Sequence, residues 1–269
     1  MSTRNNKSDF QAFRAMHETG LLRLANAWDV GSARLIESLG ARAVATTSAG
    51  MAWAAGYADG NRMPTDVVLS IADRIARAIE VPLSVDIEGG YSSEPREVGA
   101  LVVRLAEVGV VGVNLEDARE PADLLARKIE ATKTALTKAG LDVFVNARTD
   151  VYLAGLVEPP KRVAEVIDRA KVYEAAGANG LFVPVILALD EIGNVARATK
   201  LPLNVLAWDG LPAVNELEAA GVRRLSAGSG IAARVWAQAE TFARQFLDDG
   251  RLTGTSKPYG DLQTLFTEE

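Results

Sequence analysis

The hydrophobic residues of this chain follow two alternating patterns. Apolar residues at every second position, or in short unbroken runs, predict strands, and apolar residues three and four positions apart predict helices. Strand patterns occupy eight segments: 21–29, 41–50, 81–91, 110–117, 141–150, 180–184, 201–208 and 222–230. Helical patterns between them include 64–79, 94–109, 122–138 and 160–176. Eight strands separated by helices predict a (β/α)8 barrel, the TIM barrel fold of the α/β class.

The length of the chain suits that fold, because 269 residues lie near the roughly 250 of a typical barrel. We expect one domain over residues 1–269, with 229–269 as a C-terminal helical extension. A doubly wound open sheet is the alternative, but no Gly-x-Gly-x-x-Gly follows the first strand. A helical segment at 10–19 precedes the first strand, and Ser32 is expected to cap the next helix, which ends at Gly40.

Two carboxylates end the third strand pattern, in the stretch VPLSVDIEGGY. Alternation places Asp86 and Glu88 on one face of the strand, roughly 6.5–7 Å apart, with Val85 and Ile87 on the other face. Paired carboxylates followed by Gly-Gly are typical of a site for a hard divalent cation. The alternative is a strand end whose acids are simply solvated.

Other strand patterns also end in polar residues, and a barrel brings all these ends together at one mouth. The expected members of this ring are Asn26, Asp29, Thr47, Ser48, Asp86, Glu88, Glu116, Asn146, Arg148, Asn204, Ser226 and Gly228. For Asn26, Asn204 and Ser226 a structural hydrogen bond is the simpler interpretation. The acids and Arg148 instead predict a cation bound together with an anionic substrate, because buried unpaired charges are costly. The long connection 49–63 is also expected to be functional, and its one acid is Asp59.

Composition narrows the function classes. A net charge of −6 and a pI near 5.1 disfavour nucleic acids and anionic membranes as partners but allow a small anionic substrate. The absence of cysteine and the single His17 argue against thiolate nucleophiles, cysteine or histidine zinc sites and Ser-His triads. The N-terminal residues have no apolar signal segment, and no later run approaches a membrane span, so we expect a cytoplasmic protein.

Four motifs resemble the isocitrate lyase and phosphoenolpyruvate mutase superfamily over nearly the whole chain: NAWDVGSARLIESLGARAVATTSAG, VDIEGGY, GVNLED and NARTDVYL. The resemblance implies a barrel that binds Mg2+, with Mn2+ as a possible substitute, and a small 2-oxo carboxylate or its enolate. It further implies that Asp86 is the direct metal ligand and that Asp59, Glu88 and Glu116 hold the water molecules of the metal. The resemblance also implies that the backbone of Thr47, Ser48 and Ala49 binds the substrate carboxylate and that Arg148 binds its oxyanion. Asn204 is a further substrate-binding candidate.

The chain departs from that superfamily after Glu116, where lyases carry a Lys-Lys-Cys-Gly-His-type lid and mutases carry a lid with lysine and asparagine. Here DAREPADLLARKIEA passes almost at once into helix, and Asp117, Arg119 and Glu120 are expected to form a charge cluster at the helix start. We therefore expect a Mg2+-dependent lyase or decarboxylase of a small 2-oxo or 2-hydroxy carboxylate, acting through an enolate that the metal stabilises. Arg148, Glu116 and Asp59 are its catalytic candidates. The alternatives are a carbon–phosphorus bond mutase or hydrolase of the phosphonopyruvate type, and a catalytically silent 2-oxo acid binder.

The C-terminal segment predicts self-association. Val235, Ala239, Phe242 and Phe246 form one stripe of a helix that ends at Gly250. The following tail carries four more large apolar residues, Tyr259, Leu262, Leu265 and Phe266, which need a covering surface. Since members of the resembled superfamily exchange C-terminal helices between subunits, we expect a homodimer or homotetramer.

Overall fold

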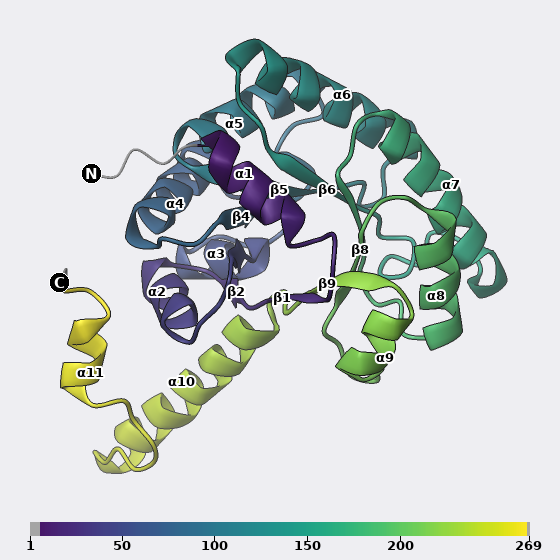
Figure 1. The fold of residues 1–269 in the computed structure, drawn as a ribbon. Helices are drawn as coiled ribbons and strands as arrows, with labels where there is room; N and C mark the ends of the chain where they lie inside the picture. The colour runs from purple at the N-terminus through teal and green to yellow at the C-terminus, as the bar shows by residue number, and fades with distance from the viewer. Residues whose placement is uncertain (1–5, 268–269) are drawn as a thin grey trace.

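A computed structural model describes residues 6–267 as a closed barrel of parallel strands surrounded by helices (Figure 1). The strand order is β1-β9-β8-β7-β6-β5-β4-β3-β2. β1 (Leu22–Leu24) and β2 (Asn26–Ala27) are successive parts of the first strand. β1 pairs with β9 and β2 pairs with β3, so this divided strand joins the two edges of the sheet. The predicted (β/α)8 barrel is therefore confirmed, and the doubly wound alternative is wrong.

The remaining strands are β3 (Val44–Thr46), β4 (Leu83–Asp86), β5 (Val110–Glu116), β6 (Phe144–Arg148), β7 (Gly180–Val183), β8 (Leu203–Leu206) and β9 (Val222–Ser226). The helices before β7 are α1 (Asn6–Ala15), α2 (Val30–Ser38), α3 (Ser48–Ala54), α4 (Thr65–Ala78), α5 (Pro95–Glu107), α6 (Ala122–Ala139), the 3-10 turn η1 (Pro159–Lys161) and α7 (Arg162–Ala175). Those after β7 are α8 (Leu189–Ala198), α9 (Val214–Ala219), α10 (Gly230–Asp249) and α11 (Tyr259–Thr264).

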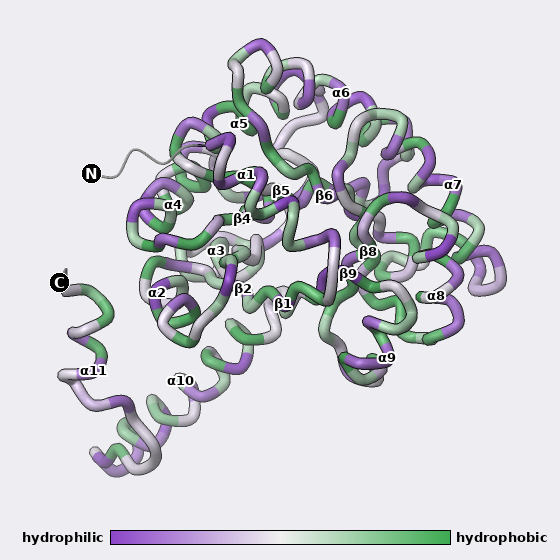
Figure 2. Tube along the Cα trace, viewed as in Figure 1, coloured by the Kyte–Doolittle hydropathy of each residue, from purple (hydrophilic) through white to green (hydrophobic). Residues whose placement is uncertain are grey.

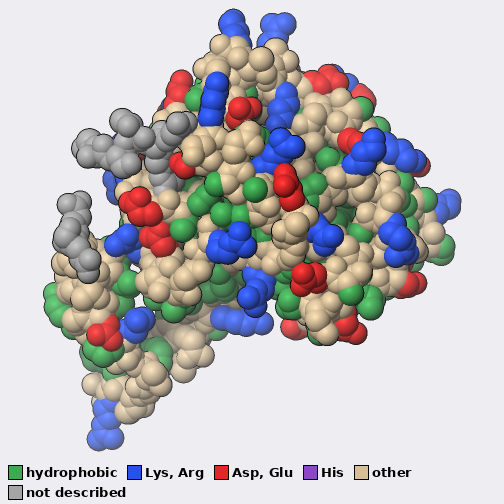
Figure 3. Space-filling model, viewed as in Figure 1, with side chains coloured by type: hydrophobic (Ala, Val, Ile, Leu, Met, Phe, Trp, Pro, Cys, Tyr) green, Lys and Arg blue, Asp and Glu red, His purple; other side chains and the backbone are tan. Residues whose placement is uncertain are grey.

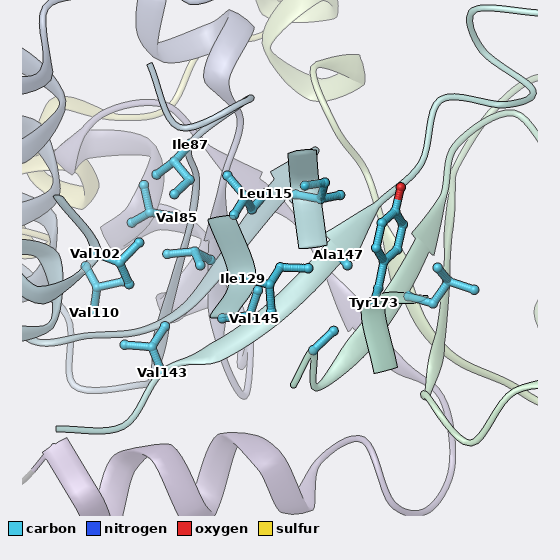
Figure 4. Packing of buried hydrophobic residues seen from close by; sticks show 14 of the residues in the cluster. Val85, Ile87, Val102, Val110, Leu115, Ile129, Val143, Val145, Ala147 and Tyr173 are labelled. Carbon is cyan, nitrogen blue, oxygen red and sulfur yellow. The ribbon is translucent and has the colours of Figure 1, made fainter. Parts of the chain in front are cut away.

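The main hydrophobic core lies between the outer face of the barrel and the helices. Val85 and Ile87 near the end of β4 and Leu115 on β5 are fully buried there, against residues such as Val102 of α5 and Ile129 of α6 (Figure 4). Figure 2 shows the same arrangement: the strands in the middle are mostly hydrophobic (green), and the surrounding helices alternate between hydrophobic and hydrophilic residues. Because Val85 and Ile87 face outward, Asp86 between them must face the barrel interior.

The N-terminal end of the barrel is closed by α1, which crosses it in Figure 1. Phe13 of α1 packs edge to face on Phe144, the first residue of β6, with ring centroids 5.6 Å apart. His17 stacks on the same ring at 4.3 Å. Since this end is filled by aromatic side chains, the accessible mouth of the barrel is at the opposite, carboxyl ends of the strands.

Two local expectations were wrong. Asp29, not Ser32, is the N-cap of α2, because its side chain accepts from the Ser32 backbone N–H at 2.7 Å while Ser32 Oγ accepts from the Asp29 N–H at 3.1 Å. The segment 49–63 is not all loop, since α3 occupies its beginning and buries Ala49 and Met51. The sequence patterns also failed to predict α8 and α9.

The C-terminal extension differs from a barrel helix. α10 leaves the barrel at the lower left of Figure 1, and Ala232 is its single buried residue in the described structure. After α10 the chain turns back, and Arg34 Nε of α2 donates to the Leu265 carbonyl at 2.7 Å. None of the helices within residues 6–267 is long and apolar enough to cross a membrane.

Candidate active site

Asp86 ends β4 at the accessible mouth of the barrel and is 8% exposed. Its Oδ2 accepts from Ser48 Oγ at 3.2 Å and from the Ser48 N–H at 3.5 Å. Its Oδ1 accepts from the Glu88 N–H at 3.3 Å. Neutral donors thus hold the Asp86 carboxylate at the junction of β4 and α3, as the prediction of a strand-end acid requires.

Glu88 is not the next inward position of the same strand, because β4 ends at Asp86 and Glu88 has a left-handed φ of 52°. The expected strand through residue 91 is therefore a turn at this point, and Gly90 makes it possible. Gly90 has φ 85°, and a Cβ on it would lie 2.7 Å from the Val98 side chain. The turn still leaves Glu88 buried at the mouth, 3% exposed.

Asn61 connects this turn to the loop that carries Asp59. The Asn61 backbone N–H donates to Glu88 Oε2, and Asn61 Oδ1 accepts from the Tyr91 N–H at 3.2 Å. Asp59 itself is exposed. Asn61 was not identified from the sequence. Its position two residues after Asp59, in a connection expected to be functional, could have indicated it.

Arg148, at the end of β6, forms ion pairs with two acids. Its Nη1 lies 2.8 Å from Glu116 Oε2, at the end of β5. Its Nε and Nη2 donate to the two carboxylate oxygens of Asp150 at 2.7 and 3.0 Å. The guanidinium also lies over the Phe182 ring, 5.7 Å from its centroid. Asp150 was not predicted as a site residue, even though it lies two positions after Arg148 in the quoted motif.

Burial raises the free-energy cost of ionising the carboxylates at the mouth. Burial raises the pKa of Asp86, although Arg148 opposes the shift. Burial likewise raises the pKa of Glu88 against the Asn61 N–H. Burial raises the pKa of Glu116 to about 8; Arg148 opposes this rise, and Asp86, Asp150 and Glu88 add to it. Because burial is the main cause of these shifts, the acids at the mouth ionise only at a cost, which a bound cation would offset.

The residues expected to bind a substrate carboxylate lie beside these acids. Thr47 is the N-cap of α3, and Ser48 and Ala49 begin its first turn. All three are buried; the Thr47 N–H donates to the Ala27 carbonyl at 3.0 Å and the Ser48 N–H donates to Asp86, whereas a first-turn N–H such as that of Ala49 has no partner within the helix. Their role toward a substrate stays a prediction.

A polar network crosses the barrel interior. Ser226 Oγ donates to Asn204 Oδ1 at 3.1 Å, and Arg224 Nε donates to Ser226 Oγ at 3.3 Å. Arg224 Nη2 and Asn146 Nδ2 both donate to Asn114 Oδ1, at 3.2 and 2.9 Å. Asn204 is thus fully buried in this network, which fits the structural interpretation better than direct substrate contact.

Two further ionisable residues anchor the mouth from outside. Lys128 of α6 is 6% exposed, and its Nζ donates to the Gly89 carbonyl at 2.6 Å, which ties α6 to the turn after β4. Asp117 accepts from Arg169 Nη1 at 2.8 Å and from the Tyr173 hydroxyl at 2.5 Å. The expectation that Asp117 belongs to a charge cluster at the helix start is wrong, since it is 1% exposed and its partners Arg169 and Tyr173 lie on α7.

The acids at the mouth suit Mg2+ in their chemistry. No cluster of three or more Asp, Glu or His side chains within residues 6–267 is already arranged as a ligand set. Mg2+ does not require one, because it uses one or two direct carboxylates and keeps several water molecules. Glu88 Oε1 is enclosed without a hydrogen bond of normal geometry among the described residues, and the Tyr91 hydroxyl is close enough to oppose the rise that burial causes in the pKa of Glu88. The chemistry of these residues fits the ion, while the direct role of Asp86 and the water-mediated roles of Glu88, Glu116 and Asp59 stay predictions.

Comparisons with known proteins agree with this geometry. The phosphoenolpyruvate phosphomutase family profile matches residues 13–247. An uncharacterized protein of Mycobacterium tuberculosis (strain ATCC 25618 / H37Rv) is 36% identical over 263 residues, 96% of each chain. A Burkholderia cenocepacia J2315 crystal structure with a provisional lyase or mutase assignment is 32% identical, with a TM-score of 0.87 over 97% of this chain and 96% of that one.

A more distant relative has a named activity. Oxaloacetate decarboxylase 1 of Pseudomonas fluorescens (strain Pf0-1) is 28% identical over 165 residues, which cover 59% of this chain and 56% of that protein. The family profile spans nearly the whole barrel, including every strand that contributes an acid or Arg148 to the mouth. The chain therefore belongs to the phosphoenolpyruvate phosphomutase family, and it is an enzyme.

Proposed function

We propose that this enzyme is a Mg2+-dependent lyase or decarboxylase of a small 2-oxo or 2-hydroxy carboxylate. The observation that carries the proposal is the placement of Asp86 and Glu88 beside the Arg148–Glu116 ion pair at one barrel mouth. An excess of buried acids favours a divalent cation, and an arginine beside them favours an anionic substrate. The decarboxylase activity of the Pseudomonas fluorescens relative points in the same direction.

The proposed metal site is formed by Asp86 directly and by Glu88, Glu116 and Asp59 through water. Bound there, Mg2+ would supply Lewis acidity, drawing electrons from the carbonyl of a 2-oxo acid. Ser48 keeps the Asp86 carboxylate at the mouth through its two hydrogen bonds to Oδ2. Asn61 keeps the Asp59 loop against Glu88, so the direct and the water-mediated acids stay together.

Arg148 is the proposed anchor and charge stabiliser for the substrate. Two of the five N–H groups on its guanidinium donate to Asp150, and its Nη1 forms an ion pair with Glu116. The N–H groups that these acids leave free can donate to substrate oxygens. Its charge would also stabilise an enolate as it forms, since preorganised donors in a site of low dielectric act strongly on developing charge. Glu116 and Asp150 would act here by fixing the plane of the guanidinium.

Two alternatives rest on specific observations. Carbon–phosphorus chemistry is favoured by the phosphomutase profile that the chain matches. A catalytically silent 2-oxo acid binder is favoured by the short β5–α6 connection, residues 117–121, which offers no lid of the superfamily type. The buried Asp117 in that connection cannot serve as a free proton-transfer group, because Arg169 and Tyr173 already hold it.

One experiment separates these three functions. Purified enzyme is incubated with oxaloacetate, methylisocitrate or phosphonopyruvate, with Mg2+ or with EDTA, and products are followed by NMR. Mg2+-dependent cleavage of a carbon–carbon bond supports the proposal. Turnover of phosphonopyruvate alone would support the phosphorus alternative. Binding of oxalate without turnover of any substrate would support the silent binder, and an Asp86→Asn variant controls for contaminating activity in every assay.

A further inference from the structure

Asn114 lies next to the proposed metal ligand inside the barrel. In the register of the sheet it pairs with Asp86 on β4 and with Asn146 on β6. Its neighbours Val113 and Leu115 belong to the outer core, so the Asn114 side chain faces the interior on the same side as Asp86. Asn114 is 3% exposed.

The Asn114 amide can take only one orientation here. Arg224 Nη2 at 3.2 Å and Asn146 Nδ2 at 2.9 Å both donate to the same atom, Asn114 Oδ1. Arginine has donors and no acceptor, so a flipped amide would set its NH2 group against the guanidinium. The two hydrogen bonds therefore assign the oxygen and fix the nitrogen on the other side of the amide carbon.

The nitrogen of that amide has no hydrogen-bond partner among the described residues. It is not one of the fully enclosed atoms without a partner, which include Asn204 Nδ2 and Arg224 Nη1. The Asn114 nitrogen is thus not completely covered by protein atoms, and it lies on the strand position that pairs with Asp86. A donor held in a fixed direction beside a metal ligand is suited to an oxygen of the bound substrate.

We propose that Asn114 Nδ2 donates a hydrogen bond to an oxyanion of the substrate held at Asp86, and that Arg224 is the positioning residue that orients this amide. The inference rests on the proposed function and adds to it a substrate contact. An NH2 group only donates, so the oxygen it recognises acts as an acceptor, and the hydrogen bond is strongest when that oxygen is charged, as in a carboxylate or an enolate.

Arg224 is unusual enough to need this explanation. It is fully buried, it is the largest such side chain in the described structure, and it has no carboxylate within ion-pair distance there. Its hydrogen bonds go to neutral groups on Asn114 and Ser226. A buried cation without an ion pair is costly, and a role in orienting a substrate contact accounts for its presence.

The test uses oxalate as probe, titrated calorimetrically into full-length enzyme with and without Mg2+. Asn114→Asp keeps both acceptor contacts with Arg224 and Asn146 but removes the N–H donors, so the fold should persist. We expect oxalate to bind about 10- to 100-fold more weakly, as for loss of a hydrogen bond to a charged group. Affinity for Mg2+ alone should not fall. Wild-type oxalate affinity in this variant would overturn the inference.

A double-mutant cycle tests the positioning role. Arg224→Met should weaken oxalate binding about 2- to 10-fold in the wild-type background, because only part of the molecules then hold the amide correctly. In an Asn114→Ala background the same change should have little effect, since no amide remains to be oriented. Arg224→Lys keeps the positive charge but not the guanidinium group, so it separates the effect of the charge on oxalate binding from the effect of amide orientation. Equal effects of Arg224→Met in both backgrounds would contradict the positioning role.

A spectroscopic readout covers variants that fail to fold. In 15N-labelled wild-type enzyme, the Asn114 side-chain NH2 resonances, assigned by their loss in Asn114→Asp, should shift when Mg2+ and oxalate are added together. Unshifted resonances under saturation would overturn the contact. If wild-type enzyme bound no oxalate at all, the proposed function would fail instead, so the two failures are distinguishable.

Discussion

Arg148 and Asp150 form a two-point ion pair at the barrel mouth, with Nε–Oδ1 and Nη2–Oδ2 distances of 2.7 and 3.0 Å. The planar fork of arginine matches the two oxygens of a carboxylate, which a lysine cannot do. In this structure the fork is occupied by Asp150, so the guanidinium meets its substrate through the N–H groups that Asp150 and Glu116 leave free. Asp150 therefore fixes the direction of those groups.

Arg148→Lys is expected to weaken oxalate binding about tenfold or more while Mg2+ binding is largely retained. Lysine keeps the positive charge but loses the fixed plane. The measurement is calorimetric titration of oxalate at saturating Mg2+, with KM as a second readout once a substrate is known. Asp150→Asn is the matched control, expected to give a smaller loss in the same direction. An unchanged KM and oxalate affinity in Arg148→Lys would remove Arg148 from the site.

Gly180→Ala should destabilise the barrel by about 1–3 kcal/mol, as overpacking of a core does. A Cβ at Gly180 would lie 2.7 Å from Asn146 Oδ1 and 2.9 Å from the Phe144 ring. Both neighbours sit inside the barrel, where neither can move freely. Gly260→Ala in α11 is the control, because nothing lies within 4 Å of its Cβ position. Equal urea midpoints for the two variants would show that the interior is looser than the structure indicates.

His17 should make the protein less stable in mild acid. Burial, with Arg224 nearby, lowers the pKa of His17 from 6.5 to about 3. Between these values the unfolded chain takes up a proton that the folded chain does not, so stability falls as pH drops below 6.5. The loss approaches about 1.4 kcal/mol per pH unit.

His17→Phe keeps an aromatic ring against Phe144 and removes the titration. We expect its stability to fall less than that of the wild type between pH 7 and pH 5, measured by urea unfolding. Glu116 contributes a slope of opposite sign, because its raised pKa favours folding as pH falls from 8 toward its usual value. That slope is common to both proteins and cancels in the difference. His17 is the single histidine of the chain. If the free energy of unfolding changed with pH in the same way in both proteins, the lowered pKa of His17 would be contradicted.

Sequence patterns were sufficient for the barrel because the eight strand segments and most of the helices have their own hydrophobic period, although α8 and α9 were not predicted. They were also sufficient to single out Asp86, since Val85 and Ile87 fix its direction. They could not identify Arg224 as an interior residue, because arginine in a strand is usually exposed and its partners Asn114 and Ser226 lie on distant parts of the sheet. The Glu88 turn was also beyond reach, because its left-handed φ depends on how the Gly90 backbone approaches Val98.

The enzyme is expected to be a homodimer or homotetramer. α10 exposes large apolar side chains: Val235 at 48%, Trp236 at 51%, Phe246 at 53% and Leu247 at 81%. Figure 3 shows hydrophobic side chains along the same C-terminal arm. Light scattering at micromolar concentration should give a multiple of 28.6 kDa. Trp236→Glu should shift the mass toward the monomer and Gln238→Glu, on the same helix, should not; a monomeric wild type would refute the prediction.

Asp86→Asn is expected to leave the protein folded and to abolish Mg2+-dependent binding of oxalate. Asparagine is nearly the same size and keeps one oxygen for the Ser48 hydrogen bonds, so the junction of β4 and α3 should survive. It removes the formal charge that a hard cation requires from a site with few direct protein ligands. Because burial already raises the pKa of Asp86, the neutral side chain should not destabilise the fold, and thermal unfolding would confirm this.

The matched controls are Glu88→Gln and Glu116→Gln, which alter the acids proposed to act on the metal through water. Each should weaken Mg2+-dependent oxalate binding less than Asp86→Asn does, since a water ligand can be retained by an amide oxygen. Glu116→Gln also removes the Nη1 ion pair of Arg148, so its effect should exceed that of Glu88→Gln. If Asp86→Asn bound oxalate with wild-type affinity and the same Mg2+ dependence, the cation would have to lie elsewhere, and the assignment of β4 as the metal-binding strand would be wrong.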